Sequence, residues 1–188
     1  MRAAITKLPE KLARWAGQAR ANPLFAPAVA AAVGIAVLDQ LAKAWIVRGL
    51  DLPGRAGGRI EISPVFDLTY VQNYGASFGL LAGGTVSRIV LSIISIGVSL
   101  ALTLWLARVH RPIAAIGVAL IIGGAVGNLI DRVSLGYVVD FLDFSALRFP
   151  WVFNVADASI NVGVGLLLLD AWLTRGGGNR DSGLGTRE

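Results

Sequence analysis

Four long apolar runs with very little charge dominate this sequence. They cover residues 24–47, 87–107, 112–130 and 151–172. Each has close to the ~20 residues that a helix needs to cross the hydrocarbon core of a bilayer. Runs of this length are rare in soluble domains, and the mean hydropathy of the chain is +0.66. The sequence therefore predicts an all-α membrane protein with four transmembrane helices.

The 188 residues leave no room for a large soluble domain beside these spans. We expect a single integral membrane unit whose four-span core covers residues 24–172. A basic segment stands before it at 1–23, and a Gly-rich polar segment follows at 173–188. The second segment is expected to be flexible, because its composition offers little apolar surface to bury.

Two interpretations of the basic segment 1–23 remain open. Ile5, Leu8, Leu12 and Trp15 recur at helical spacing, and lysines and arginines lie off that face. This pattern is typical of an amphipathic helix lying on a membrane surface. The alternative is a disordered basic tail that only orients the first span. A cleaved signal peptide is not favoured, since the apolar run that follows continues without a clear processing site.

The distribution of positive charge predicts the orientation of the spans. Basic residues cluster in 1–23, in the loop 108–111 and after the last span. With four spans, all three clusters fall on one side, which the positive-inside rule assigns to the cytoplasm. Both termini are then cytoplasmic, and segments 48–86 and 131–150 face outside. The net charge of +5 is explained by this topology and by contact with anionic membrane lipid, so no nucleic-acid partner is expected.

The first outer segment carries signs of β structure. Residues 59–62 and 66–70 alternate polar and apolar side chains, the second only in part, and Pro53-Gly54 and Ser63-Pro64 supply turns. We expect a small extracytoplasmic β element of short strands resting on the membrane surface. A loop at 73–81 is expected to return to the interface.

Two aspartates stand beside apolar runs on the outer side. Asp140 lies within Val-Val-Asp-Phe, and Asp157 lies near the start of the last apolar run. Ionisable groups in such places are costly and tend to be functional. Two carboxylates held close together share one proton, so that one activates water while the other donates to a substrate oxygen. The alternative is that each Asp caps a helix or anchors it at the interface.

Three other acids are given lesser roles. Asp131 ends the third apolar run and is the main competitor for a place in the pair. Its neighbour Arg132 suggests instead a charged, paired and non-catalytic carboxylate. Asp143 and Asp170 are expected to be exposed acids at the interface.

Other chemistries have few residues to work with. The chain has no Cys, which excludes disulfides, thiol nucleophiles and thiolate metal sites on it. Its single His, His110, lies in a short basic loop, and this argues against a His-based triad or a His-ligated metal. No metal and no cofactor is expected.

Four blocks of the sequence resemble bacterial lipoprotein signal peptidase, also called signal peptidase II, and occur in that family's order. They are Leu-Asp-Gln-Leu-Ala-Lys at 38–43, Val-Gln-Asn-Tyr-Gly-Ala-Ser-Phe-Gly at 71–79, the stretch 123–143, and Phe-Asn-Val-Ala-Asp at 153–157. The resemblance covers most of 24–172. It implies a membrane aspartic endopeptidase that removes the signal peptide from diacylglyceryl-modified prolipoproteins, N-terminal to the lipidated Cys. Its expected location is the bacterial inner membrane, and its expected state is a monomer.

The resemblance also implies roles for particular residues. Asp140 and Asp157 match the catalytic dyad. The substrate-binding or supporting positions are matched by Asn73, Asn128, Arg132, Asn154, Asp39 and Lys43.

Simpler roles remain open for the supporting residues. Asp39 and Lys43 are four residues apart and would form a pair that neutralises itself. Asn128 and Asn154 would satisfy free backbone groups at helix ends. Arg132 would contact lipid headgroups.

Two non-enzymatic functions compete with the peptidase. One is a small transporter or lipid-binding protein whose polar residues form a conduction path, and the other is a structural scaffold subunit. A transporter is expected to place polar residues through the midplane of several spans. Residues 87–107 and 112–130 have almost none, and the polar groups gather at one face. The preferred hypothesis is therefore a peptidase whose site lies near the outer face, with the β element and the 73–81 loop closing over the substrate.

Overall fold

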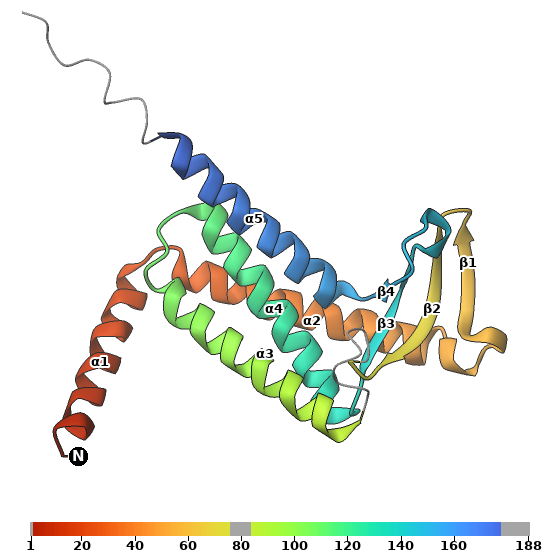
Figure 1. Cartoon of the computed structure of the whole chain (residues 1–188), viewed down its shortest axis with the longest axis horizontal. Helices are drawn as coiled ribbons and strands as arrows, with labels where there is room; N and C mark the ends of the chain where they lie inside the picture. The colour runs from red at the N-terminus through yellow and green to blue at the C-terminus, as the bar shows by residue number, and fades with distance from the viewer. Residues whose placement is uncertain (1, 76–83, 178–188) are drawn as a thin grey trace, which may run out of the picture.

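The computed structural model describes residues 2–75 and 84–177, and the side chains of residues 9–75 and 84–175. Within these residues the chain forms five α-helices and four strands (Figure 1). In chain order they are α1 (Arg2–Ala21), α2 (Phe25–Ala44), β1 (Arg59–Ser63), β2 (Phe66–Asn73), α3 (Thr85–Leu106), α4 (Pro112–Ser134), β3 (Val138–Asp143), β4 (Val152–Phe153) and α5 (Val155–Gly177).

Four of the helices are long and apolar enough to cross a membrane, which confirms the predicted number of spans. These spans are Phe25–Gly54, Thr85–Leu106, Pro112–Ser134 and Val155–Arg175. The last one starts later than the apolar run that predicted it, because Val152 and Phe153 are in β4. Asn154 then ends the extended segment, and its side-chain oxygen accepts the backbone N–H of Asp157 at 2.9 Å. An Asn in this position is a preferred N-cap, so the helix begins just after it.

α4 is the central helix of the bundle and packs against α2, α3 and α5 (Figure 1). Its glycines allow this close packing. A Cβ on Gly123 would lie 2.6 Å from the Ala32 carbonyl oxygen of α2, and one on Gly124 would lie 2.4 Å from the Ala156 carbonyl oxygen of α5. Small residues on two sides of α4 therefore set the distance to both neighbours.

The predicted β element is confirmed and is larger than expected. Four antiparallel strands pair in the order β1-β2-β3-β4. β1 and β2 coincide with the alternating segments of the sequence, whereas β3 and β4 were not predicted. Pairing of β2 with β3 places Val71 opposite Asp140 and Asn73 opposite Val138.

The sheet is fixed to one end of the bundle by a small apolar core. Beyond Ala44 the first span continues as a π-helical turn, Trp45–Gly49, and a 3₁₀ turn, Leu52–Gly54. These turns bury Ile46 and Leu52 completely against residues of the sheet such as Leu68, Val139 and Phe141. The sheet therefore lies at the end of α2 that is remote from α1 (Figure 1).

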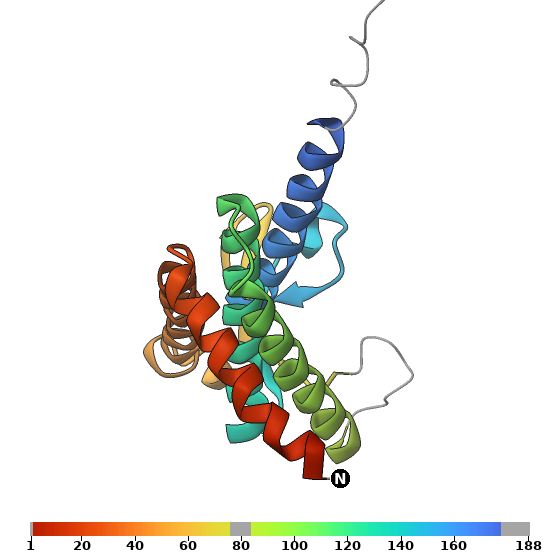
Figure 2. The same ribbon diagram turned by 90° about the vertical axis from the view of Figure 1, so that its left-hand side faces the viewer.

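The basic N-terminal segment is helical, which decides between its two interpretations in favour of a helix. α1 crosses the end of the bundle opposite the sheet and runs over α3 (Figures 1 and 2). Its contact with a membrane surface stays a prediction. The C-terminal prediction was wrong in part, because α5 continues through Gly176 and Gly177. The remainder of that segment, and residues 76–81 of the predicted loop, lie outside the described residues.

Candidate active site

Asp140 is held on β3, next to the central strand β2. Its side chain is 1% exposed, although a carboxylate buried without partners would be very costly. Asn73 donates from Nδ2 to Oδ2 of Asp140 at 2.9 Å, and Asn154 donates from Nδ2 to Oδ1 at 2.6 Å. Asn73 and Asp140 are diagonal neighbours on one face of the sheet, which brings their side chains into reach.

Asp157 lies in the first turn of α5, where it forms a reciprocal cap with Asn154. The backbone N–H of Asp157 donates to Asn154 Oδ1 at 2.9 Å, and the backbone N–H of Asn154 approaches Asp157 Oδ2 at 3.4 Å. This is the geometry of a capping box. Asn128 of α4 donates from Nδ2 to the other oxygen, Oδ1, at 2.7 Å.

Asn154 joins the two carboxylates, because its backbone and amide oxygen hold Asp157 while its Nδ2 donates to Asp140. Burial and, next, the charge of Asp157 raise the pKa of Asp140 to about 7, against the opposing hydrogen bonds from Asn73 and Asn154. The two acids therefore interact electrostatically. Near neutral pH, one proton is available to the pair.

A buried ionic cluster supports this pair from the side of α2 and α4. Lys43 Nζ lies 2.7 Å from Asp39 Oδ2 and 2.9 Å from Asp131 Oδ2, and it donates to Asn128 Oδ1 at 3.2 Å. All four side chains are at most 5% exposed. The predicted pair of Asp39 and Lys43 is thus confirmed, but it belongs to a larger network.

Two carboxylates of the cluster also hold the backbone beside each aspartate of the pair. Asp39 Oδ1 accepts the N–H of Ala156 at 2.9 Å, and Asp131 Oδ2 accepts the N–H of Val139 at 3.0 Å. Ala156 precedes Asp157, and Val139 precedes Asp140. The cluster therefore fixes the two backbone segments, one in β3 and one in α5, from which the two carboxylates project.

The suggested pairing of Asp131 with Arg132 is wrong. Asp131 pairs with Lys43, and its other oxygen accepts a hydrogen bond from Gln40 Nε2 at 2.8 Å. Arg132 is half-buried and donates from Nη1 to the Asn128 carbonyl oxygen at 3.4 Å. Since Lys43 is 88 positions away in the sequence, the pairing follows from the packing of α2 on α4 and not from neighbours along the chain.

The prediction that Asp143 and Asp170 are exposed was also wrong, since each is 6% exposed. Asp143 accepts hydrogen bonds from Thr69 Oγ1 at 2.7 Å and from the Ser145 N–H at 2.9 Å. Burial alone would raise the pKa of Asp143, but these hydrogen bonds outweigh it and leave the pKa below its usual value. Asp170 pairs at 2.5 Å with Arg111, at the end of the bundle away from the sheet.

A cleft of about 480 Å³ opens between the sheet side and α5, next to the pair. One part of its wall is polar and another part is aromatic. The sequence had not indicated a role for the aromatic residues. The cleft is lined by Asn73, Phe149, Trp151, Val152, Phe153, Asp157, Ile160 and Asn161. A substrate in this cleft would contact Asp157 directly.

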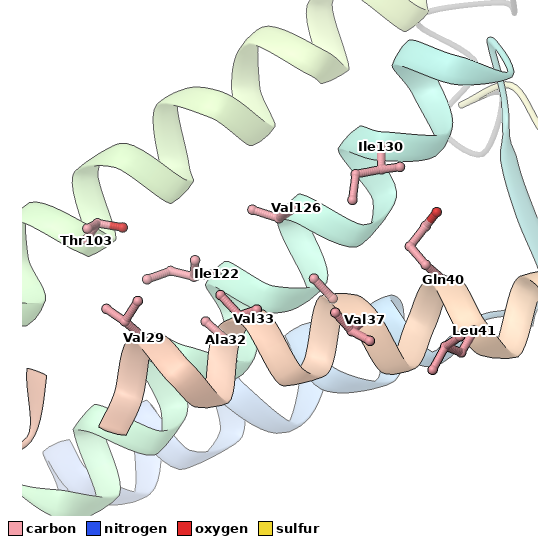
Figure 3. A pocket seen from close by; sticks show the side chains of 11 residues that line it. Val29, Ala32, Val33, Val37, Gln40, Leu41, Thr103, Ile122, Val126 and Ile130 are labelled. Carbon is pink, nitrogen blue, oxygen red and sulfur yellow. The ribbon is translucent and has the colours of Figure 1, made fainter. Parts of the chain in front are cut away.

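A second hollow, of about 490 Å³, lies among α2, α3 and α4 (Figure 3). Aliphatic side chains such as Val33, Val37 and Ile122 form most of its wall. Gln40 extends from α2 toward Ile130 of α4 at one end of it. The hollow is lined by no acid among the described residues, so acid/base chemistry belongs to the cleft beside Asp157.

The arrangement supports hydrolysis by a pair of acids. One carboxyl can hold a proton while the other, hydrogen-bonded carboxylate takes a proton from water. The amide groups of Asn73 and Asn154 donate to Asp140, and Asn73 also lines the cleft. Among the described residues, no group of three or more His, Cys, Asp or Glu side chains is placed to hold a metal ion.

The chain is similar in sequence to several known proteins. The family model described as Signal peptidase (SPase) II matches residues 31–173. A lipoprotein signal peptidase of Caulobacter vibrioides is 52% identical over 149 residues, which are 78% of this chain and 87% of that protein. The lipoprotein signal peptidase of Shewanella loihica is 44% identical over 144 residues, or 73% of this chain and 81% of that protein.

A solved structure described as a bacterial membrane enzyme, determined by the in meso method at 2.3 Å resolution, has a similar fold. Its TM-score is 0.70 at 28% sequence identity, and the match covers 86% of this chain and 96% of that one. The four helices and the sheet therefore form an arrangement already observed in a membrane enzyme.

Proposed function

We infer, from the premise that this chain belongs to the signal peptidase II family, that it cleaves prolipoproteins with Asp140 and Asp157 as its catalytic dyad. The chain is a multi-pass membrane aspartic endopeptidase. Family membership decides against the transporter and scaffold alternatives. The assignment of particular residues to the reaction is our proposal.

One observation carries the assignment of the dyad. Asn154 contacts both Asp140 and Asp157, and the second of these lines an open cleft. Every other acid near the site is occupied, since Asp39 and Asp131 are buried in ion pairs with Lys43. Among the described acids, Asp140 and Asp157 share Asn154 as a hydrogen-bond partner, and Asp157 lines the cleft.

The proposed reaction uses one proton held by the dyad. Asp140 carries it, in keeping with its pKa of about 7, and hydrogen-bonds to the oxygen of the scissile carbonyl. Asp157 takes a proton from water, whose oxygen adds to the carbonyl carbon while Asp140 gives its proton to the carbonyl oxygen. When the C–N bond breaks, Asp157 gives its proton to the leaving nitrogen and Asp140 recovers its own. The dyad is therefore unchanged after one turnover.

The supporting residues have positioning roles in this proposal. Asn73 and Asn154 orient Asp140, and Asn128 orients Asp157. Lys43 and Asp39 hold the underlying backbone. With the cleft closed to bulk water, these fixed donors would replace the solvent that a peptide bond normally contacts.

The proposed substrate is a prolipoprotein that carries a diacylglyceryl group on the Cys after the cut. The aromatic side chains of Phe149, Trp151 and Phe153 form the apolar wall of the cleft. Phe149 packs against the other two with ring-centre distances of 5.3 and 6.0 Å. Such a wall suits an acylated glyceryl group at the edge of a bilayer, with the signal peptide entering sideways from the membrane.

The proposed location is the bacterial inner membrane, with both termini cytoplasmic and the dyad near the outer face. Basic residues at the end of the bundle away from the sheet support this orientation. The proposed working form is a monomer. No cofactor is part of the proposal.

The direct test is to incubate purified protein with a lipidated precursor and to look for the shortened product. Asp140→Asn and Asp157→Asn should each lower the rate of cleavage by at least about 10³-fold, because each removes a group that transfers a proton. Asp51→Asn, which alters an exposed acid, is the matched control and should keep full activity. Folding of each variant is checked by its thermal unfolding. Substantial cleavage by either dyad variant would remove that residue from the proposed pair.

A further inference from the structure

The helix α1 lies outside the residues matched to the family, yet it is attached to the bundle at a defined angle. Trp15 Nε1 donates to the Leu104 carbonyl oxygen of α3 at 3.1 Å, and the Trp15 ring packs edge-on against Phe25. At the turn between α1 and α2, Asn22 Nδ2 donates to the Leu106 and Val109 carbonyl oxygens at 3.0 and 2.8 Å. These contacts hold α1 across the end of α3 (Figure 2).

The crossing of α1 over α3 encloses two adjoining hollows that share Lys11, Trp15 and Arg108. The larger, of about 510 Å³, is completed by Leu12, Ala101, Leu104 and Trp105. The smaller, of about 380 Å³, is completed by Arg14 and Gln18. One side of the concavity is therefore apolar and aromatic, and the other is cationic.

The positive charge of this concavity is not neutralised within the described part of the protein. Lys11, Arg14 and Arg108 form no ion pair with any described side chain, and no carboxylate lines either hollow. Arg108 has one polar partner, Gln18, to which its Nε donates at 3.5 Å. Three cations in one concave surface create a positive potential that attracts anions.

The chemistry of the ligand follows from its surroundings. The concavity lies at the end of a transmembrane bundle, so that the nearest abundant anions are phospholipid headgroups. Basic pockets between membrane helices bind such headgroups, and Trp side chains prefer the same depth. The apolar wall of the larger hollow continues from the cations along α3, through Trp105 and Ala101, and Leu12 of α1 completes it. An acyl chain attached to a phosphate would require such a surface.

We propose that the concavity between α1 and α3 is a binding site for an anionic phospholipid. The phosphate lies among Lys11, Arg14 and Arg108, and one acyl chain lies beside Ala101 and Trp105. The bound lipid fixes α1 to the membrane surface at the end of the protein opposite the dyad. This inference does not depend on the proposed catalytic residues.

The test measures lipids retained by the purified full-length protein, using native mass spectrometry after incubation with phosphatidylglycerol or phosphatidylethanolamine. The wild type should retain phosphatidylglycerol in preference. The double variant Arg14→Gln/Arg108→Gln should retain about tenfold less of it, because each cation near an anionic surface adds to the affinity. Arg20→Gln/Arg175→Gln removes the same charge from exposed positions outside the concavity and should retain lipid as the wild type does.

A second variant tests the apolar half without any change in charge. Ala101→Phe fills the larger hollow and should displace the acyl chain, whereas Ile93→Phe, at an exposed position of α3 outside it, should not. Cleavage of a lipidated precursor in detergent should persist in all four variants, which shows that they are folded.

Three outcomes would overturn the proposal. Equal loss of phosphatidylglycerol in both double variants would mean that net charge alone attracts the lipid. Equal retention of the two lipids by the wild type would mean that the headgroup is not recognised. Displacement of lipid by millimolar inorganic phosphate, together with full retention by Ala101→Phe, would indicate a site for free anions.

Discussion

At the residue scale, Lys43 organises the site although none of its hydrogen bonds reaches the proposed dyad. It forms ion pairs with both Asp39 and Asp131, and each of these acids holds a backbone N–H directly before one member of the dyad. Lys43 thereby couples α2 to both β3 and α5. The sequence predicted only an ion pair between Lys43 and Asp39 on one helix. In the structure Lys43 lies where α2, α4, β3 and α5 meet.

Replacement of Lys43 should therefore damage both stability and activity. Lys43→Met leaves two acids buried without a counterion, and breaking a buried pair in this way typically costs about 3–5 kcal/mol. We expect a large fall in the thermal unfolding temperature and loss of precursor cleavage. Arg175→Gln, at an exposed position, is the control. An unfolding temperature equal to that of the wild type would show that the cluster is not ionised as described.

The pKa of Asp140 predicts a dependence of stability on pH. Its folded-state pKa of about 7 lies above the ordinary value of 3.8, so the folded protein binds more protons than the unfolded chain between these values. Stability should then fall as pH rises from about 4 to about 7, with a slope of at most about 1.4 kcal/mol per pH unit from this group. Chemical unfolding of wild type and Asp140→Asn across this range measures the slope, which the variant should lack.

The same group predicts the alkaline limb of the activity profile. Asp140 serves as the proton donor, so the rate of cleavage should fall as pH rises above about 7 and the proton is lost. Asp51→Asn should leave the profile unchanged. An activity that continued to rise well above neutral pH would assign the proton to another group.

Not all of these residue roles were hidden in the sequence. Asn154 and Asp157 have the spacing of a capping box, so their mutual hydrogen bonds were within reach of pattern analysis. The partner of Asp131 was not, because Lys43 comes from a different helix. The burial of Asp170 was also beyond reach of local patterns, because its partner Arg111 lies far away in the sequence, directly before α4. The sequence indicated only that Arg111 belongs to a basic loop.

At the scale of elements, the packing of α4 decides how closely the two acids can approach. Several glycines make close contacts between α4 and its neighbours. Gly117 and Gly163 face each other between α4 and α5, where a Cβ on either would lie within 2.9 Å of the other's carbonyl oxygen. Gly124 lies against Ala156, next to Asp157.

A methyl group at Gly124 should therefore push α5 away from α4. Overpacking of this kind costs about 1–3 kcal/mol, and here it also moves the first turn of α5, which carries Asp157. Gly124→Ala should lower both the unfolding temperature and the cleavage rate. Gly97→Ala is the matched control, since no atom lies within 4 Å of its Cβ position. Equal behaviour of the two variants would contradict the role given to this contact.

The sheet shows where local patterns succeed and where they fail. β1 and β2 have a polar and an apolar side, and their alternation was visible in the sequence. All residues of β3 except Leu142 are buried, so the strand has no alternation to detect. β4 is only two residues long. Neither β3, which carries Asp140, nor β4 therefore has a periodic pattern that would predict a strand.

At the scale of the whole molecule, the two ends of the bundle have opposite chemistry. The sheet, the dyad and the cleft gather at one end, and α1 with its basic residues crosses the other (Figure 1). The number of spans and the arrangement of charge were predictable from the positions of apolar runs and basic residues along the sequence. The crossing of α1 over α3 was not, because it depends on hydrogen bonds between residues about 90 positions apart.

The absence of cysteine allows a clean test of the proposed topology. Single cysteines are introduced at Glu61, which is exposed on β1, and at Ser182, near the C-terminus. A thiol reagent that does not cross membranes should label Glu61→Cys in intact cells and should label Ser182→Cys only after lysis. The cysteine-free parent is the control for background labelling. The reverse pattern would invert the orientation.

The two acids of the proposed dyad belong to parts of the protein that are built in different surroundings. One projects from a strand of the sheet, and the other from a helix long and apolar enough to cross the bilayer. A chain that has inserted its helices but has not yet paired its strands would hold only one of the two acids at the site. We therefore expect hydrolytic activity only after the sheet has formed.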